Sequence, residues 1–237
     1  MIPIEEWINQ PEIQRIKDQP LPQLLGESLN RDPMRAIFYN PDLFLSPADG
    51  TILYSRVVAP GEQIIPIKGV KYTTEDLLRE EVKEVCLVIS IFMTCVDVHV
   101  NRIPTDGFLH HTHLDPLKVM NLSMRPVEQM ILEKLELNLD NLKYGVYNER
   151  VKNDIYYSNI KQHYWLIQIA DFEVDVIAHF GQPHDNYTQG ERFSVVKLGS
   201  QVDLIIPFIN REVTFISLAK ELHHVEAGVD PLVRIIK

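Results

Sequence analysis

The stretch RFSVVKLGSQVDLIIP, residues 192–207, places a glycine and a serine between two apolar runs that both have the content of buried strands. Glycine weakens a strand because it packs no side chain, and a buried serine hydroxyl needs a hydrogen-bond partner. The pair Gly199-Ser200 therefore marks either a bulge or tight bend, or a peptide bond that is itself reactive. The rest of the chain has to decide between these two interpretations.

The composition is that of an acidic protein with an ordinary core. Of 237 residues, 45% are hydrophobic and 24% are charged, which suits a globular domain. Lys and Arg number 23 against 33 Asp and Glu, giving a net charge of −10, and the basic residues form no cluster. Such a chain gains little from phosphate backbones or anionic lipid surfaces, so we expect no nucleic-acid partner.

The two cysteines, Cys86 and Cys95, lack the spacing of a zinc or redox site and are typical of free thiols in a reducing compartment. The first twenty residues are charged and contain prolines, unlike a signal peptide, and the apolar runs are too short to cross a bilayer. We therefore expect a cytoplasmic protein whose membrane contact, where it exists, is peripheral.

Residues 1–35 are predicted to form an N-terminal helical arm, because prolines separate short segments with helical patterning. Ile4, Trp7 and Ile8 share one helical face. That face either docks on the body of the protein or touches a lipid interface, and docking is favoured.

Residues 36–237 are predicted to form one domain in which strands dominate. Short alternating runs between glycines and prolines are typical of antiparallel strands, and Val85–Met93 is predicted as a buried strand. Residues 126–143 carry apolar residues at helical spacing behind Pro126. The fold class is therefore α+β, a β-rich core of mostly antiparallel strands with the short N-terminal helical arm and one longer helix.

Polar residues that interrupt apolar runs are the candidates for chemistry. The motif SPADG contains Asp49 at an Asp-Gly turn, which is common turn chemistry on its own. In TCVDVHVNRIPTDG, residues 94–107, alternation predicts that Asp97, His99 and Asn101 share the polar face of a strand.

Asp49, His99 and Ser200 supply a carboxylate, an imidazole and a hydroxyl, the components of a nucleophilic triad. The GxSxG elbow of the α/β-hydrolases does not surround Ser200, so a conventional serine hydrolase is disfavoured.

Histidines cluster in HHTHL and LHH, as His110, His111, His113, His223 and His224. Adjacent histidines on a strand point apart, and only His111 and His113 are spaced to share a face. No HExxH motif occurs, so solvated loops are favoured over a metal site and we expect no metal.

Six blocks in order resemble the phosphatidylserine decarboxylase family, the pyruvoyl-dependent lipid lyases. They are RDPMR, SPADG, IKGVKYTTEDLL, FMTCVDVHVNRIPTDG, YNERV and QGERFSVVKLGSQVDLIIP, spread over residues 31–228. The last is the most specific, and DVHVNR with GSxVD is closest to the short bacterial and archaeal branch.

The resemblance implies that the Ser200 hydroxyl attacks the carbonyl carbon of Gly199 and converts the peptide bond to an ester. Asp49, with help from His99, would then act as the base that removes the Ser200 Cα proton. The chain would then break after Gly199 into residues 1–199 and 200–237. Glycine suits this role because, lacking Cβ, it tolerates a strained backbone.

The new terminus at Ser200 would carry a pyruvoyl group, the implied cofactor. Its ketone would form a Schiff base with the substrate amine and withdraw electrons as CO₂ leaves, converting phosphatidylserine to phosphatidylethanolamine. His99 is the implied donor of the proton that replaces CO₂.

Three departures from the family pattern leave alternatives open. Arg102 stands where the longer branch has a second histidine, Gln201 follows the serine, and paired arginines are replaced by Glu173–Val176. These motivate the same chemistry on a soluble amino acid or other aminoacyl compound, or a non-catalytic member that no longer cleaves itself. The expected partners are a phospholipid or small aminoacyl substrate and a further copy of the chain in a homo-oligomer.

Overall fold

The computed structural model describes most of the chain: residues 1–20, 23–24, 26, 30–117, 121–134, 138–171, 177–182, 184–196 and 200–237. Gly199 and the Glu173–Val176 segment lie outside the described residues.

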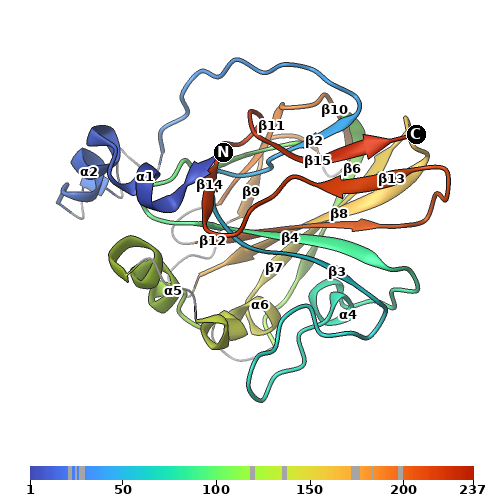
Figure 1. Ribbon diagram of the computed structural model, residues 1–237, viewed down its shortest axis with the longest axis horizontal. Helices are drawn as coiled ribbons and strands as arrows, with labels where there is room; N and C mark the ends of the chain where they lie inside the picture. The colour runs from blue at the N-terminus through green and yellow to red at the C-terminus, as the bar shows by residue number, and fades with distance from the viewer. Residues whose placement is uncertain are drawn as a thin grey trace.

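A nine-stranded sheet crosses the molecule, and every strand in it pairs antiparallel with its neighbours (Figure 1). The strands, in spatial order, are β1 Ile2–Pro3, β14 His223–Val225, β3 Gly50–Val58, β4 Cys86–Met93, β12 Ser200–Pro207, β8 Gln162–Ala170, β7 Arg150–Tyr157, β6 Gly107–Leu114 and β10 His184–Tyr187. The predicted strand Val85–Met93 is confirmed as β4, and the strand that begins at Ser200 lies at the centre of the sheet.

Two small antiparallel sheets cover one face of the large sheet, and α4 Thr74–Leu78, α5 Arg125–Gln129 and α6 Tyr144–Tyr147 lie on the other (Figure 1). The two helices of the N-terminal arm lie at one end of the sheet, near β14 (Figure 1). The small sheets contain β5 Val100–Arg102, β11 Arg192–Val196 and β9 Ile177–His179, and β13 Thr214–Ser217, β15 Pro231–Ile236 and β2 Leu43–Leu45. This architecture confirms the α+β, β-rich fold class.

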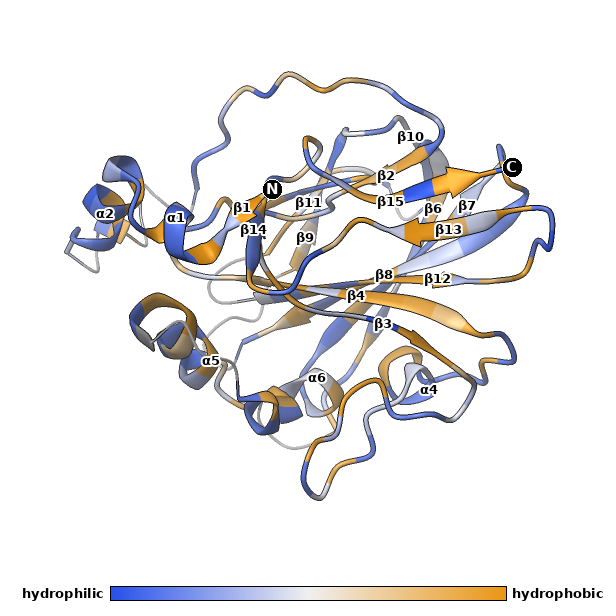
Figure 2. Ribbon diagram, viewed as in Figure 1, coloured by the Kyte–Doolittle hydropathy of each residue, from blue (hydrophilic) through white to orange (hydrophobic). Residues whose placement is uncertain are grey.

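The large sheet separates two hydrophobic cores, because side chains alternate across it. On β12, Val202, Leu204 and Ile206 enter the core beneath the small sheets, whereas Ile205 enters the core on the helical side. Apolar residues accordingly occupy the central strands (Figure 2). Ser200 has the same parity as Val202 and belongs to the face covered by the small sheets.

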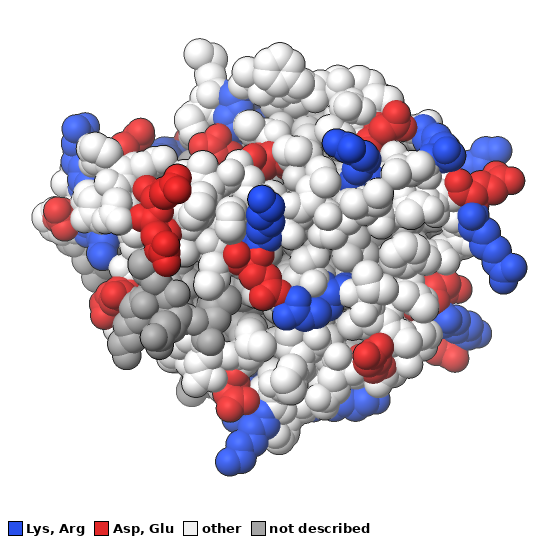
Figure 3. Space-filling view, viewed as in Figure 1, with Lys and Arg blue, Asp and Glu red and all other residues white. Residues whose placement is uncertain are grey.

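The N-terminal arm contains α1 Ile4–Ile8 and α2 Pro11–Lys17. Ile4, Trp7 and Ile8 are 3 to 5% exposed, so the predicted docking of this face on the body is confirmed. No helix in the described parts of the chain is long and apolar enough to span a bilayer. On the face drawn in Figure 3, basic and acidic side chains are interspersed.

The single long helix predicted over residues 126–143 is wrong. The described residues there form short segments, α5 Arg125–Gln129, the π-turn η2 Met130–Lys134 and the 3₁₀ turn η3 Leu139–Lys143, followed by α6 Tyr144–Tyr147. The side chain of Asn138 accepts a hydrogen bond from the Asp140 amide and begins a new turn. Asn and Asp compete with the helix in this way, which apolar periodicity alone does not reveal.

The helix predicted in YTTEDLLREE is confirmed as α4, Thr74–Leu78. Its N-cap is Thr73, whose side chain and that of Asp76 bond each other's backbone amides in a capping box. Polar caps of this kind are visible in sequence because both partners lie within four residues.

Candidate functional site

Strand register brings the predicted site residues to one end of the large sheet. Phe92 of β4 is paired with Thr51 of β3 on one side and with Gln201 of β12 on the other. One step further along, Ser200 is paired with Met93, the last residue of β4. The start of β3, the end of β4 and the start of β12 therefore meet, and Asp49 and Ser200 lie two strands apart.

Gly50 explains the Asp-Gly pair in SPADG. Its φ is +149°, and a Cβ atom there would lie 2.2 Å from the carbonyl oxygen of Phe92. Only glycine allows β3 to begin this close to β4. The turn therefore has a backbone reason, and it also delivers the Asp49 carboxylate to the sheet end.

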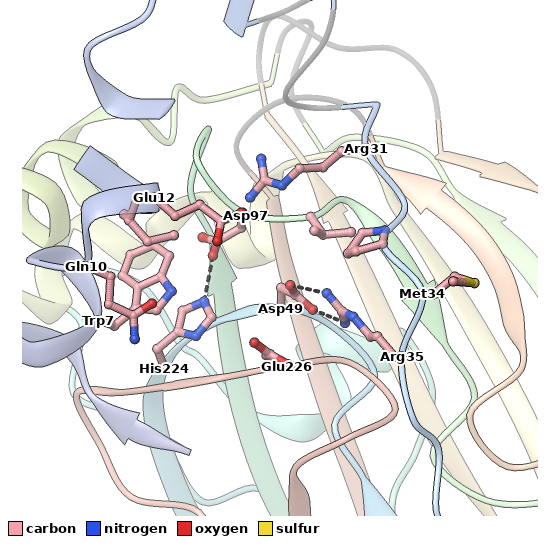
Figure 4. Close-up of a pocket in the computed structure, with 13 residues that line it drawn as sticks. Trp7, Gln10, Glu12, Arg31, Met34, Arg35, Asp49, Asp97, His224 and Glu226 are labelled. Carbon is pink, nitrogen blue, oxygen red and sulfur yellow. Dashed lines mark hydrogen bonds and ion pairs between the residues drawn. The ribbon is translucent and has the colours of Figure 1, made fainter. Parts of the chain in front are cut away.

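Asp49 is buried and its carboxylate is held on both oxygens. Arg35 donates from both terminal nitrogens, at 2.5 and 2.6 Å, and the Ala227 amide donates at 2.8 Å (Figure 4). Asp49 therefore makes no hydrogen bond to His99 among the described residues. Arg35 belongs to the RDPMR block, but sequence reasoning did not identify it as the partner of Asp49.

His99 is fully buried in the connection between β4 and β5. Its Nδ1 lies 3.1 Å from the backbone oxygen of Asp97, and its Nε2 has no hydrogen-bond partner in the described structure. Burial lowers the pKa of His99 despite the nearby negative charges of Asp97 and Asp49. The imidazole is therefore neutral near pH 7 and keeps one nitrogen available.

The predicted strand face carrying Asp97, His99 and Asn101 is wrong. Asp97 lies in a turn in which its amide bonds the Thr94 carbonyl, and the strand begins only at Val100. Asn101 instead joins a buried polar network, accepting from Gln168 at 2.6 Å. The turn frees Asp97 to point away from His99.

Asp97 forms a buried pair with His224 of β14, 127 positions later in the chain. His224 Nε2 lies 2.7 Å from Asp97 Oδ1, and the amide and hydroxyl of Thr94 both donate to Oδ2 at 2.7 Å. Trp7 stacks on the His224 ring, with centroids 4.0 Å apart. The prediction that His224 lies in a solvated loop is wrong, and sequence reasoning missed this pair.

A cavity of about 280 Å³ opens beside these groups (Figure 4). Its walls come from the N-terminal arm, the turn that precedes β3, the turn after β4, and β14 with the residue that follows it. The lining residues are Trp7, Gln10, Glu12, Ile13, Arg31, Pro33, Met34, Arg35, Asp49, Asp97, Val98, His224 and Glu226.

The chain on either side of the Gly199-Ser200 bond approaches this sheet end. The Val196 amide donates to the carbonyl of His99 at 3.1 Å, and four residues later Ser200 enters β12 between Met93 and Ala170. Ser200 is fully buried. The predicted role of Gly199 falls on a residue outside those described.

Gln201 and Arg102, which stand where the family pattern has other residues, each make hydrogen bonds within the fold. Gln201 accepts from the hydroxyl of Tyr144 at 2.7 Å and donates to Asp203 at 2.8 Å. Arg102 donates to the carbonyl of Gly190 and to Asp32. Burial raises the pKa of Asp203 to about 6, although the hydrogen bonds from its neighbours oppose that shift.

The other histidines lie mostly on β6 and its neighbours rather than in loops, which corrects the prediction for HHTHL. His111 and His113 do share a face, edge to ring at 6.0 Å. Across strands, His110 stacks on His184 and His111 on His179. No group of three or more His, Cys, Asp or Glu side chains among the described residues is arranged to hold a metal ion.

Comparison with known proteins points in one direction. Residues 29–230 match the family described as phosphatidylserine decarboxylase. A phosphatidylserine decarboxylase proenzyme of Chlorobium phaeobacteroides is 30% identical over 75% of this chain and 66% of its own length, and one of Beijerinckia indica is 29% identical over 75% and 62%. A Methanocaldococcus jannaschii protein, provisionally named an archaetidylserine decarboxylase proenzyme, is 30% identical over 75% and 76%. The chain thus spans less than two thirds of the length of the bacterial relatives.

Proposed function

The chain belongs to the phosphatidylserine decarboxylase family, and from this we propose that it is a self-processing carboxy-lyase that converts phosphatidylserine to phosphatidylethanolamine. The relatives' names, which describe proenzymes, support both the reaction and the processing step.

The observation that carries the proposal is the convergence of Asp49, His99 and Ser200 at one end of the sheet. The three residues come from separate parts of the sequence, and strand register alone places two of them in neighbouring rows. A carboxylate, a neutral imidazole and a buried hydroxyl in one water-poor region are the groups that acyl transfer to a serine requires.

Processing would proceed through bonds of the chain itself. The Ser200 oxygen attacks the Gly199 carbonyl carbon, and the bond from that carbon to the Ser200 nitrogen breaks, leaving an ester. Removal of the Ser200 Cα proton then expels the Gly199 carboxylate and leaves dehydroalanine. Addition of water releases ammonia and leaves a ketone at the head of residues 200–237.

In this scheme His99 and Asp49 have different tasks. His99 has an unpaired buried nitrogen, so it takes the hydroxyl proton and later returns a proton at the position vacated by CO₂. Asp49 is fixed by Arg35 as a carboxylate and contributes its charge and basicity to the removal of the Cα proton. This division replaces a direct Asp49–His99 contact.

The surroundings of residue 200 fit the ketone-bearing group. The position is fully buried, flanked by Met93 and Ala170, and the unpaired His99 nitrogen lies at the same sheet end. A pyruvoyl group would supply a carbonyl that accepts the substrate amine and withdraws the electrons left by CO₂. The chain's contribution is to exclude water and to hold the proton donor.

A soluble aminoacyl substrate is the second candidate. The cavity is lined by the carboxylates Glu12, Asp49, Asp97 and Glu226 against two arginines, a balance that suits an amine better than an anionic head group. Release of CO₂ from phosphatidylserine in detergent micelles, compared with free serine, separates the two candidates.

We further propose that residues 1–35 act as an arm of the domain formed by residues 36–237. The phospholipid would be reached by peripheral contact with a membrane from the cytoplasmic side, and the assembled protein would be a homo-oligomer. Vesicle co-sedimentation and light scattering of the purified protein test these assignments.

The decisive experiment is intact-mass spectrometry of the purified protein. We expect two chains, residues 1–199 and 200–237, the second carrying a carbonyl that reacts with hydrazine. Ser200→Ala should give one full-length chain. Ser90→Ala, which removes a buried hydroxyl from the neighbouring strand β4, is the matched control and should cleave normally. An uncleaved wild-type protein that releases CO₂ from substrate would refute the proposal.

A further inference from the structure

A primary amine cannot add to a ketone while it is protonated, so a decarboxylase of the proposed kind needs a base for the substrate ammonium. His99 does not line the cavity, and neither does residue 200, so the ammonium group has to lose its proton in the cavity before the amine reaches the ketone. We propose that His224, held by Asp97 and Trp7, is the base that accepts the ammonium proton. This inference rests on the proposed function and adds a residue that the family resemblance does not assign.

The hydrogen bond to Asp97 sets the tautomer of the neutral His224 ring. An ionised carboxylate can only accept, so the Nε2 atom facing Asp97 Oδ1 at 2.7 Å carries the hydrogen. Nδ1 is then the lone-pair nitrogen, and it has no hydrogen-bond partner among the described residues. His224 lines the cavity, so this nitrogen is the one left to meet a ligand.

Asp97 also stabilises the imidazolium that forms when His224 takes the proton. Burial raises the pKa of Asp97, but hydrogen bonds from His224 and Thr94 outweigh it and lower that pKa below its ordinary value. The carboxylate is therefore charged at the pH where the amine must be deprotonated. The Asp–His pair is buried, with side chains 1% and 5% exposed, so bulk water screens it little.

Trp7 fixes the orientation of the ring. It stacks on His224 with the two ring planes 10° apart, which prevents the imidazole from turning about its bond to Cβ. Trp7 belongs to α1, and residues before 29 lie outside the family match. The arm therefore contributes to the site a wall that the family description does not include.

The charges around His224 favour a cationic guest. Arg35 neutralises Asp49, and Arg31 is then a single cation against the carboxylates of Glu12, Asp97 and Glu226, which are in excess. The titratable and charged groups facing His224 from the packed elements are Asp97, Asp49, Glu12, Glu226, Arg31 and Arg35. An ammonium group entering the cavity of about 280 Å³ is thus attracted to the place where His224 can deprotonate it.

The test compares two amines that differ in their protonation at pH 7. Ethanolamine is protonated and needs a base, whereas methoxyamine is already neutral. Each is captured on the ketone of the processed protein, ethanolamine with cyanoborohydride, and the mass gained by residues 200–237 is followed with time. We expect His224→Gln to slow ethanolamine capture about 100-fold and to leave methoxyamine capture within twofold of wild type.

The controls separate chemistry from folding. His223→Gln alters the neighbouring histidine, whose Nδ1 faces the Glu221 carbonyl at the surface, and should capture both amines at wild-type rates. Normal self-cleavage of His224→Gln shows that it folds. Trp7→Leu, which frees the ring, should slow ethanolamine capture less than His224→Gln does.

The pH dependence gives a second readout. The defect of His224→Gln in CO₂ release should shrink as pH rises, because more of the amine is then neutral without help. Equal slowing of both amines, or no slowing of either, would overturn the role of His224. Absence of methoxyamine capture by the wild-type protein would instead show that no ketone forms, so the proposed function would fail first.

Discussion

Two groups of histidines in this molecule differ in what surrounds them. At the sheet end, His99 and His224 both lie against Asp97, one on its backbone oxygen and one on its carboxylate. On β6 and its neighbours, His111 stacks on His179 with centroids 3.8 Å apart, and this pair has no carboxylate partner among the described residues. The group on β6 and its neighbours contains more histidines, but its His111–His179 pair lacks the carboxylate partner that would assist proton transfer.

The difference also appears in the electrostatics of the second group. Burial, followed by the neighbouring imidazoles, lowers the pKa of His179 to about 4 and that of His111 in the same direction. These rings are kept neutral by packing, whereas an imidazole paired with a carboxylate is stabilised when protonated. The comparison teaches that the proposed site is distinguished by the carboxylate beside its histidines rather than by the number of histidines in a motif.

The largest effect is expected from removing the carboxylate of Asp97, the residue that both site histidines contact. Asp97→Asn keeps the shape of the side chain but loses the charge that acts on both site histidines, so we expect CO₂ release to fall at least about 100-fold. The measurement is the initial rate at pH 7 on processed protein. Asp154→Asn, which alters the partly exposed pair with His163, is the control and should retain wild-type activity. An Asp97→Asn rate within threefold of wild type would contradict the assignment.

A second prediction concerns stability at low pH. Because the folded-state pKa of His179 is lowered to about 4, the unfolded chain binds a proton that the folded chain does not as pH falls below the ordinary value of 6.5. The contribution of His179 to the free energy of unfolding is therefore fully present above pH 6.5 and is lost as the pH falls from 6.5 to 4. After allowance for solvent screening, we expect a loss of about 2 kcal/mol from this group.

Urea unfolding of the wild type and of His179→Gln at pH 7 and at pH 4.5 measures this loss. The variant should lose less stability between the two pH values than the wild type, by about the stated amount. The two proteins showing the same pH dependence would mean that the stacked ring is free to protonate in the folded state.

The smallest expected effect on stability and activity is at the stacked pair His110 and His184. His184 is exposed and stacks on His110 at the edge strand β10, with centroids 4.4 Å apart. His184→Gln should change the free energy of unfolding by no more than about 0.5 kcal/mol and leave CO₂ release unchanged. Chemical denaturation and the activity assay check both values, and a tenfold loss of activity would show that the second group reaches the reaction after all.

The strands that carry the site are predictable from sequence, because a buried strand such as β4 is an apolar run and its turn residues are local. The docking face of the arm is equally visible in the spacing of Ile4, Trp7 and Ile8. The interruption of the helix after residue 125 cannot be predicted from apolar spacing, because it depends on Asn138, whose side chain begins a new turn.

Of the proposed site, the sequence predicts Asp49, His99 and Ser200, and strand register brings Asp49 and Ser200 to one end of the sheet. The sequence alone does not predict that Arg35 or His224 belongs to this site. Each is a long-range partner chosen by the packing of the arm and of β14, and no periodicity links Asp97 to a residue 127 positions later. The nearest signal is the spacing of Thr94 and Asp97, which predicts a local hydrogen bond to one carboxylate oxygen and leaves the second oxygen without a predicted partner.

Strand β12 lies fifth of nine in the large sheet, hydrogen-bonded to β4 on one side and β8 on the other. A break in the chain just before it would therefore leave two polypeptides threaded through each other, with residues 200–237 also supplying β13, β14 and β15. They would stay together without a covalent link, but after denaturation they would have to find each other by collision instead of by loop closure. The mature protein would be durable as long as it stays folded and would not reassemble readily once taken apart.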